Sequence, residues 1–297
     1  LAGFSAQFDG LQADIGEQID SFFRAKECTS VYVEASRMTL ADLNRFRKKH
    51  PALTFLTGGE LDEHIQALRA CKTAEELLLM TKAQDIASKS FTELLDYIKP
   101  GVFERDLAAE LEYRMRLNGA DGPSFETIVV SGPNSSKPHG VPGRRALQPG
   151  DFITIDFGAL YHGYHSDTTR TVALGEPTEE MKLVYDTVRL AQETAVEALH
   201  AGMTARDYDK VARDIITEAG FGPYFGHSLG HGVGIEIHEE PFCGPLSPSV
   251  LQVGNVVTSE PGIYLPGKFG VRIEDMLQVT ETGSENFCKL TKDLLVL

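Results

Sequence analysis

Residues 179–220 read EEMKLVYDTVRLAQETAVEALHAGMTARDYDKVARDIITEAG. The spacing of apolar positions predicts a long helix from Glu179 to His200, followed by a shorter one from Ala205 to Glu218. The two predicted helices are followed by Ala201-Gly202 and Ala219-Gly220, and glycine commonly ends a helix at such a position. This stretch therefore predicts a pair of helices joined by a short connection.

The same helix pair occurs earlier in the chain. An apolar stripe with a 3.6-residue period predicts a long helix over residues 73–99, which Pro100-Gly101 ends. A second helix is predicted from about Glu104 to Leu117. A shift of 101 positions (202 − 101 = 101) superposes Gly101 on Gly202, Arg105 on Arg206, Asp106 on Asp207 and Gly119 on Gly220.

Each helix pair is followed by strand-like segments. They cover residues 128–130, 152–156 and 167–173 after the first pair, and 256–260 and 271–279 after the second. We interpret this order as a duplication. The sequence predicts an α+β fold in which each half packs its sheet against its own helices and a cleft forms where the halves meet.

Residues 1–68 differ from this pattern. Short apolar runs at 31–33 and 53–56 alternate with a charged helical stretch at 41–49, which predicts a small α/β piece. We therefore expect two domains, over residues 1–68 and 69–297.

Composition excludes several classes of function. The 297 residues carry 28 basic and 43 acidic side chains, a net charge of −15, which disfavours binding to phosphate backbones and hence to nucleic acid. No apolar run approaches the roughly 18 residues of a membrane span, and the first residues do not resemble a secretory signal. We expect a soluble, cytoplasmic protein without a membrane partner.

Two aspartates flank a predicted hairpin. Asp156 ends one strand and Asp167 opens the next, and a two-residue turn at Tyr161-His162 would place them opposite each other (156 + 167 = 323 = 161 + 162). Carboxylates directly across an antiparallel pair lie about 5 Å apart and repel each other, and a multivalent cation between them reverses that penalty. The alternative is a pair of solvated aspartates at a sheet edge.

Histidines and glycines alternate closely in residues 227–239, HSLGHGVGIEIHE. The spacing lacks the HExxH pattern of zinc-protease helices, and three glycines disfavour a helix. No strand–GxGxxG–helix order surrounds them, so a dinucleotide-binding loop is a weak alternative. We predict an extended, bulged segment whose glycines permit close approach and whose His231 and His238 contribute to a site.

Two further acids lie in apolar strands. Glu260 ends the strand 256–260 without a local partner, whereas Glu274 shares a predicted strand face with Arg272, so a salt bridge between these two is the alternative to a functional role. Four strand-borne carboxylates and at least one histidine suit divalent ions such as Mn²⁺, Co²⁺ or Zn²⁺. Two such ions about 3.5–4 Å apart could share a hydroxide, which indicates a dinuclear hydrolase.

Five ordered motifs then resemble a known family, the pita-bread metallopeptidases, which contain the Xaa-Pro dipeptidases (prolidases), aminopeptidase P and methionine aminopeptidase. The resemblance runs from about Leu68 to the last residue. The motifs are DFGA (156–159), SDTTRT (166–171), HSLGHGVGIEIHE (227–239), SEPGIY (259–264) and VRIED (271–275).

The resemblance implies the pita-bread fold and five ligands for two divalent metal ions, with Mn²⁺ favoured over Co²⁺ or Zn²⁺. In it, Asp167 and Glu274 bridge both ions, Asp156 completes one, and His231 and Glu260 complete the other. These ligands are Asp156, Asp167, His231, Glu260 and Glu274.

The resemblance also implies roles around the metals. Glu260 is the acid/base that takes a proton from a metal-bridging hydroxide or water, and His238 hydrogen-bonds the scissile carbonyl or the oxyanion. His139 lies near the substrate, His227 lines the pocket for the residue after the cut, and Arg272 supports the metal ligands as in the proline-specific branch.

Motif detail resembles the Xaa-Pro branch more than methionine aminopeptidase, which implies hydrolysis of the bond before proline in dipeptides or short peptides. Because proline lacks an amide N–H, such enzymes need a dedicated pocket. A methionine-aminopeptidase-like exopeptidase and a non-catalytic peptide-binding scaffold are the alternatives. The branch also implies a homodimer and a longer N-terminal domain, so we interpret residues 1–68 as a partial creatinase/prolidase-like domain.

Overall fold

The computed structural model describes residues 15–297 and divides the chain into two compact units, with the boundary between Leu68 and Arg69. The smaller unit contains a parallel pair of short strands, in which Ser30 pairs with Thr54. Its helices and strands are α2 (Ile15–Ala25), β1 (Ser30–Tyr32), α3 (Leu40–Lys49), β2 (Thr54–Leu56) and α4 (Glu60–Ala70), which continues past the boundary.

The first half of the larger unit begins with the predicted helix pair. Thr73 accepts a hydrogen bond from the amide of Glu76 while the Glu76 carboxylate accepts one from the amide of Thr73, and this capping box starts the first helix. The helices are α5 (Ala74–Leu94), the 3₁₀ turn η1 (Leu95–Tyr97) and α6 (Glu104–Leu117).

Two antiparallel sheets follow this pair. One has the order β4-β5-β8, from Ile128–Ser131, Asp151–Phe157 and Thr168–Leu174, and the other has the order β3-β6-β7, from Gly122–Pro123, Ala159–Tyr161 and Tyr164–His165. A 3₁₀ turn, η2 (Gly132–Ser136), follows β4.

The second half repeats the plan. Its helices are α7 (Glu179–Ala198) and α8 (Ala205–Glu218), followed by the turn η3 (Gly222–Tyr224). A five-stranded sheet has the order β10-β9-β11-β14-β15, and β12 pairs with β13. These strands are β9 (Gly230–Gly232), β10 (Glu239–Cys243), β11 (Val256–Ser259), β12 (Gly262–Leu265), β13 (Phe269–Arg272), β14 (Asp275–Val279) and β15 (Ser284–Asn286).

The duplication predicted from the sequence is confirmed by the helix bounds. Helix α8 begins and ends 101 residues after α6 (205 − 104 = 101; 218 − 117 = 101). The paired glycines at 101 and 202, and at 119 and 220, all have φ between +85° and +107°, a region that favours glycine. The helix ends therefore recur because the same backbone turn recurs.

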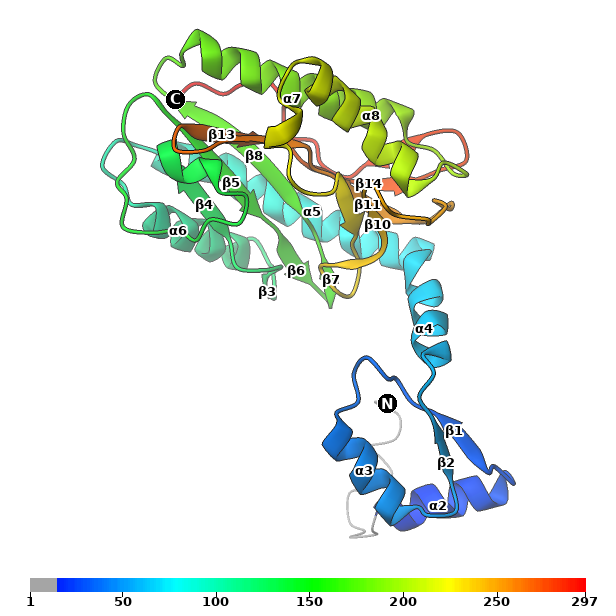
Figure 1. Cartoon of the computed structure of the whole chain (residues 1–297). Coiled ribbons are helices and arrows are strands. Elements are labelled where there is room, and N and C mark those ends of the chain that lie inside the picture. The colour runs from blue at the N-terminus through cyan, green and yellow to red at the C-terminus, as the bar shows by residue number, and fades with distance from the viewer. Residues whose placement is uncertain (1–14) are drawn as a thin grey trace. The chain divides into compact units, whose positions relative to one another are not determined.

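Two large apolar cores pack the helix pair of each half against strands. In Figure 1 the pair α5 and α6 lies on one side of the strands and the pair α7 and α8 on the other. One core joins α5 and α6 to the sheet β4-β5-β8 through side chains such as Phe91 and Phe157, whose rings stack 5.2 Å apart. The other core joins α7 and α8 to the strands β10 to β14 of the second half and also includes Phe152 of β5. The strands between the helix pairs are thus buried on both faces.

Two local expectations were wrong. In the hairpin, Tyr161 pairs with Tyr164, so the turn is His162-Gly163 and Asp156 faces Thr169 rather than Asp167. Both turn residues have positive φ, +50° and +83°, which a glycine at the second position accommodates. The strand predicted over 271–279 is interrupted between β13 and β14, and Glu274 lies in the interruption.

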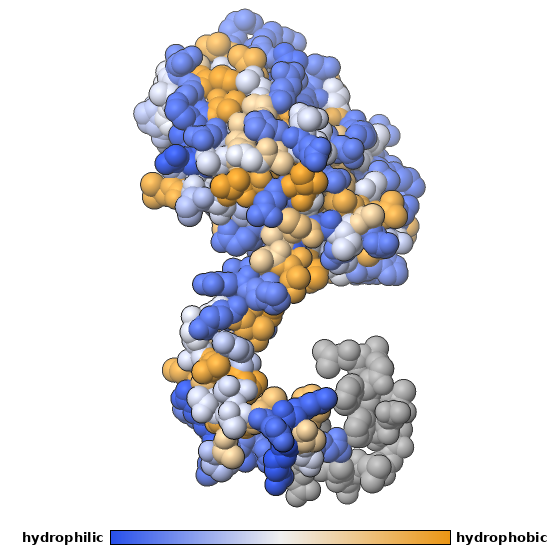
Figure 2. Space-filling view, turned by 90° about the vertical axis from the view of Figure 1, so that its right-hand side faces the viewer, coloured by the Kyte–Doolittle hydropathy of each residue, from blue (hydrophilic) through white to orange (hydrophobic). Residues whose placement is uncertain are grey.

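The surface mixes residue types. Figure 2 shows hydrophilic and hydrophobic residues interspersed on the face in view. Within residues 15–297, no helix combines the length and apolar character needed to cross a bilayer.

Candidate metal centre

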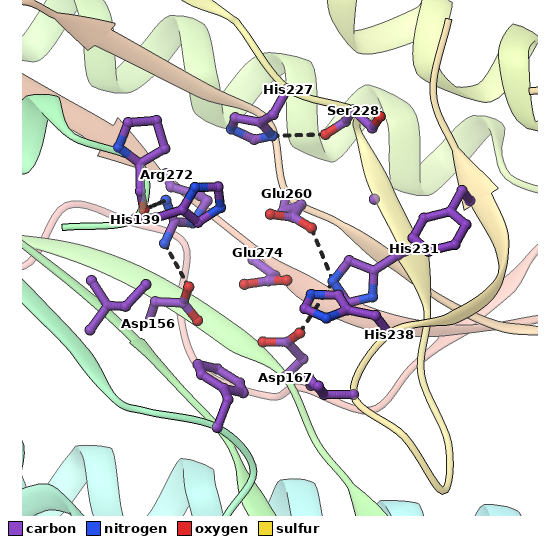
Figure 3. Close-up of a pocket in the computed structure, with 16 residues that line it drawn as sticks. His139, Asp156, Asp167, His227, Ser228, His231, His238, Glu260, Arg272 and Glu274 are labelled. Atoms are coloured by element: carbon purple, nitrogen blue, oxygen red, sulfur yellow. Dashed lines mark hydrogen bonds and ion pairs between the residues drawn. The ribbon is translucent and has the colours of Figure 1, made fainter. Parts of the chain in front are cut away.

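The residues with predicted roles line one cavity of about 320 Å³ in the larger unit. Figure 3 shows their side chains converging on this space from several strands and loops. They are His139, Asp156, Asp167, His227, His231, His238, Glu260, Arg272 and Glu274. The structure thus brings together groups that are up to 135 positions apart in sequence (274 − 139 = 135).

The first half of the duplication supplies two carboxylates. Asp156 is the sixth residue of β5, and Asp167 directly precedes β8. Gly158 makes this arrangement possible, because a Cβ there would lie 1.9 Å from the carbonyl oxygen of Ser166. The two strands therefore approach closely just beyond Asp156, and both aspartates reach the same cavity.

The second half supplies the histidine. His231 is the central residue of β9, whose backbone N–H donates to Thr258 Oγ1 at 3.1 Å. A Cβ at Gly230 would lie 2.2 Å from the carbonyl oxygen of Thr258. The glycine before His231 is thus required by the close approach of β9 to β11, and this approach delivers the imidazole to the cavity.

The protonation of His231 points to a cation. Its Nδ1–H donates to the carbonyl of Gly232 at 3.0 Å, which leaves Nε2 without a proton. Burial lowers the pKa of His231 to about 4, so the ring is neutral at neutral pH. Nε2 nevertheless lies 3.5 Å from a carboxylate oxygen of Asp167 and 3.4 Å from one of Glu260. The Nε2 lone pair and the carboxylate oxygens would repel one another, whereas a metal ion bound by all of them would remove the repulsion.

The carboxylates of the cavity also lie in surroundings that disfavour their charged form. Burial, together with repulsion from neighbouring carboxylates, raises the pKa of Asp167 and of Glu274 well above the usual range, and burial raises the pKa of Glu260 to about 8. Ligand atoms of Asp167, His231 and Glu274 all lie within 4.8 Å of one another. A divalent cation offsets this concentration of negative charge, so the donor set fits divalent metal ions.

Arg272 contacts Asp156 rather than Glu274, contrary to the salt bridge considered as an alternative. Its Nη2 donates to Asp156 Oδ2 at 2.6 Å, and the other oxygen of Asp156, Oδ1, is buried without a hydrogen-bond partner. Glu274 instead accepts from Thr169 Oγ1 at 2.7 Å, and Arg272 Nε donates to that same hydroxyl at 3.0 Å. Arg272 therefore orients both carboxylates, and Asp156 Oδ1 has a free lone pair toward the cavity.

The remaining histidines surround the carboxylates. The Nδ1–H of His227 donates to the carbonyl of Ser228, so its Nε2 accepts from the hydroxyl of Tyr264 at 2.9 Å. His139 and His238 are exposed at the cavity, and the ring of His238 lies 4.3 Å from that of His231. These side chains can meet a ligand that enters the cavity.

Sequence reasoning assigned no role to several residues that shape the site. Tyr264 links His227 to Arg272, whose Nη1 donates to its hydroxyl at 2.8 Å. Thr169 carries the contact between Arg272 and Glu274. Tyr264 stands in the motif SEPGIY and Thr169 in SDTTRT, so both were within quoted motifs. Three apolar wall residues gave no sequence signal that separates them from core positions; they are Phe125, Ile128 and Ile237.

Comparison with known proteins agrees with this geometry. The model of metallopeptidase family M24 matches residues 78–281. The chain belongs to metallopeptidase family M24. The Xaa-Pro dipeptidase of Pyrococcus furiosus is 42% identical over 279 residues, which cover 94% of this chain and 79% of that relative.

Two solved peptidase structures superpose over nearly the whole chain. A structure of an Xaa-Pro dipeptidase from Bacillus anthracis has a TM-score of 0.92 and 41% identity, covering 97% of this chain and 80% of that one. An X-Pro aminopeptidase from Thermotoga maritima has a TM-score of 0.90 and 37% identity, with coverage of 96% and 80%. The predicted pita-bread fold is confirmed, and the chain is a hydrolase of the metallopeptidase class that uses divalent metal ions.

Proposed function

We propose that this M24 peptidase hydrolyses the peptide bond that precedes proline, in Xaa-Pro dipeptides or at the N-terminus of short peptides, with two divalent metal ions. The observation that carries the proposal is the convergence of Asp156, Asp167, His231, Glu260 and Glu274 on one cavity. Relatives that share more than a third of its residues include Xaa-Pro dipeptidases and an X-Pro aminopeptidase.

The five converging side chains hold the two ions in this proposal, and Mn²⁺ is the favoured metal because oxygen donors predominate. When bound, the ions polarise the scissile carbonyl and lower the pKa of the attacking water. Glu260, ionised once cations offset the neighbouring negative charge, would take the proton of that water and pass it to the leaving nitrogen.

The histidines and the apolar wall bind the substrate. His238, exposed and next to His231, donates a hydrogen bond to the scissile carbonyl oxygen as negative charge develops there. His227, fixed by Tyr264, and His139 both line the part of the cavity that takes the proline ring in this proposal. Because proline has no amide N–H to donate, its pocket must recognise the shape of the ring. Phe125, Ile128 and Phe242 line the cavity and supply apolar contacts for it.

A substrate-length series tests the proposal. Purified protein is freed of metal and reloaded with Mn²⁺, Co²⁺ or Zn²⁺, then assayed with Xaa-Pro, Xaa-Pro-Xaa and longer peptides. We expect hydrolysis before proline that a chelator abolishes. Preference for Met-Ala peptides would support a methionine-aminopeptidase-like specificity instead, and absence of hydrolysis with every metal would support the binding scaffold.

The same series separates dipeptidase from aminopeptidase. Activity confined to Xaa-Pro identifies a dipeptidase, whereas activity that persists with longer peptides identifies an aminopeptidase. The proposal includes a homodimer, which light scattering on the loaded enzyme measures directly.

A further inference from the structure

A buried ionic cluster contacts the turn that precedes His238 on the side away from the cavity. Glu239 accepts from Arg69 Nε at 3.0 Å and pairs with Lys72 Nζ at 3.2 Å. The side chains of Lys72 and Glu239 are only 2% and 4% exposed, and that of Arg69 is 21% exposed. We call Arg69, Lys72 and Glu239 the rear ion cluster.

Glu239 also closes the turn itself. Its Oε1 accepts the backbone N–H of Glu236 at 3.0 Å, and the carbonyl of Glu236 in turn accepts the N–H of Gly234 at 3.0 Å. A Cβ at Gly234 would lie 2.5 Å from Glu239 Oε2 and 2.9 Å from Lys72 Cε. A side chain at position 234 would therefore displace Glu239 and Lys72 from their present positions.

The rear ion cluster lies outside the cavity. None of its members is among the lining residues, whereas the adjacent Ile237 and His238 are. Glu239 begins β10 and pairs with Gly232 of β9, and His238 is the last residue of the bend that leads into this strand. The backbone next to His238 is thus held both by strand pairing and by the buried side chain of Glu239.

We propose that Glu239, held by Arg69 and Lys72, is a positioning residue that aims His238 into the cavity. This inference rests on the proposed function, in which His238 hydrogen-bonds the scissile carbonyl. A buried carboxylate between two cations cannot rotate without losing both partners, so the turn has one arrangement. Within residues 15–297, the structure shows no hydrogen bond to the His238 side chain. The direction of the imidazole therefore depends on the backbone that carries it.

Substitutions of Arg69, the most exposed member, test the inference while the buried Lys72–Glu239 pair remains. Arg69→Met leaves the Lys72–Glu239 pair in place, and Arg69→Lys keeps the charge. We expect Arg69→Met to lower kcat on Xaa-Pro by on the order of 10- to 100-fold with KM within about twofold, because a misaimed group acts on the transition state. We expect Arg69→Lys to restore most of the loss. Lys72→Met should produce at least the same loss of kcat.

A matched control distinguishes an effect on the orientation of His238 from a general loss of stability. Arg114 of α6 is 26% exposed and pairs with Glu110 at 2.7 Å, and neither residue lines the cavity. Arg114→Met therefore removes a comparable ion pair and should leave kcat within about twofold of the wild type. Bound metal, measured by elemental analysis, should be the same in all variants. Loss of metal in Arg69→Met would overturn the inference, because the cluster would then act on the metal ligands.

A double-substitution cycle with His238→Ala decides the route of the effect. If the cluster acts through His238, Arg69→Met lowers kcat in the wild-type background and causes no further loss in the His238→Ala background. An equal loss in both backgrounds, or no loss in the first, overturns the inference while the proposed function stands. A loaded wild type that does not cleave Xaa-Pro overturns the proposed function itself, which keeps the two failures distinct.

Discussion

At the scale of single residues, the cavity holds charge that serves function at the expense of stability. Asp167 and Asp275 are both buried aspartates, yet their surroundings differ. Burial and neighbouring carboxylates raise the pKa of Asp167, whereas burial of Asp275 is outweighed by Arg170 and Lys292, which hold its pKa at about 2. The surroundings of Asp167 thus disfavour the charged carboxylate, whereas those of Asp275 stabilise it.

This contrast predicts opposite effects of one substitution. In metal-free protein, Asp167→Asn should raise the free energy of unfolding by about 1–3 kcal/mol, because it removes a repelled charge. Asp275→Asn should lower it by about 3–5 kcal/mol, because Arg170 is left buried without its partner. Urea unfolding in excess chelator measures both. Asp167→Asn should also reduce activity by at least about a hundredfold, and destabilisation by Asp167→Asn would contradict the prediction.

His227 predicts a pH dependence of stability. Burial, reinforced by Arg272, lowers its pKa to about 4, below the 6.5 expected of an unfolded chain. The neutral ring is therefore favoured by folding, and this contribution is complete above pH 6.5 and is lost as the pH falls toward 4, at no more than about 1.4 kcal/mol per pH unit. Metal-free wild type and His227→Gln, unfolded in urea between pH 7 and 4.5, should differ in slope. Parallel pH curves would contradict it.

At the scale of helices and strands, sequence reasoning succeeded where local chemistry decides. The bounds of α8 and the start of α5 follow from end signals that lie within a few residues, such as Thr73 and Glu76. The hairpin register was missed because a turn at His162-Gly163 differs from one at Tyr161-His162 only in which residues take positive φ. The interruption at Glu274 was missed because its cause, the contact with Thr169, comes from a strand more than 100 positions away.

The glycine before His231 carries the element-scale prediction. Gly230→Ala places a Cβ against the backbone of Thr258, so β9 must move from β11, and we expect a loss of about 1–3 kcal/mol in the free energy of unfolding. Gly226→Ala is the matched control, since a Cβ there meets nothing within 4 Å. Urea unfolding compares the two variants with the wild type. Equal stability of both would show that β9 is not held as closely as the geometry indicates.

At the scale of the whole molecule, the centre belongs to both halves of the duplication. Asp156 and Asp167 come from the first half, and His231, Glu260 and Glu274 from the second. The resemblance of the ordered motifs to the pita-bread metallopeptidases predicted which residues would share a site, and these residues line one cavity. The resemblance was not sufficient to predict their partners: the pairing of Arg272 with Asp156 depends on how the halves pack, which no local pattern records.

Metal removal gives the last prediction. All of the converging ligands belong to residues 69–297, the larger unit, so bound metal adds to the stability of that unit alone. A ligand at 100 times its Kd adds about 2.7 kcal/mol per site, which should raise the Tm of the larger unit by several degrees. Calorimetry of the full chain with Mn²⁺ and with chelator should show two transitions, of which only one responds to metal. Asp167→Asn should remove most of that response. A single transition that shifts as a whole would mean that the two units unfold together, and identical traces with and without Mn²⁺ would remove the basis for a metal centre.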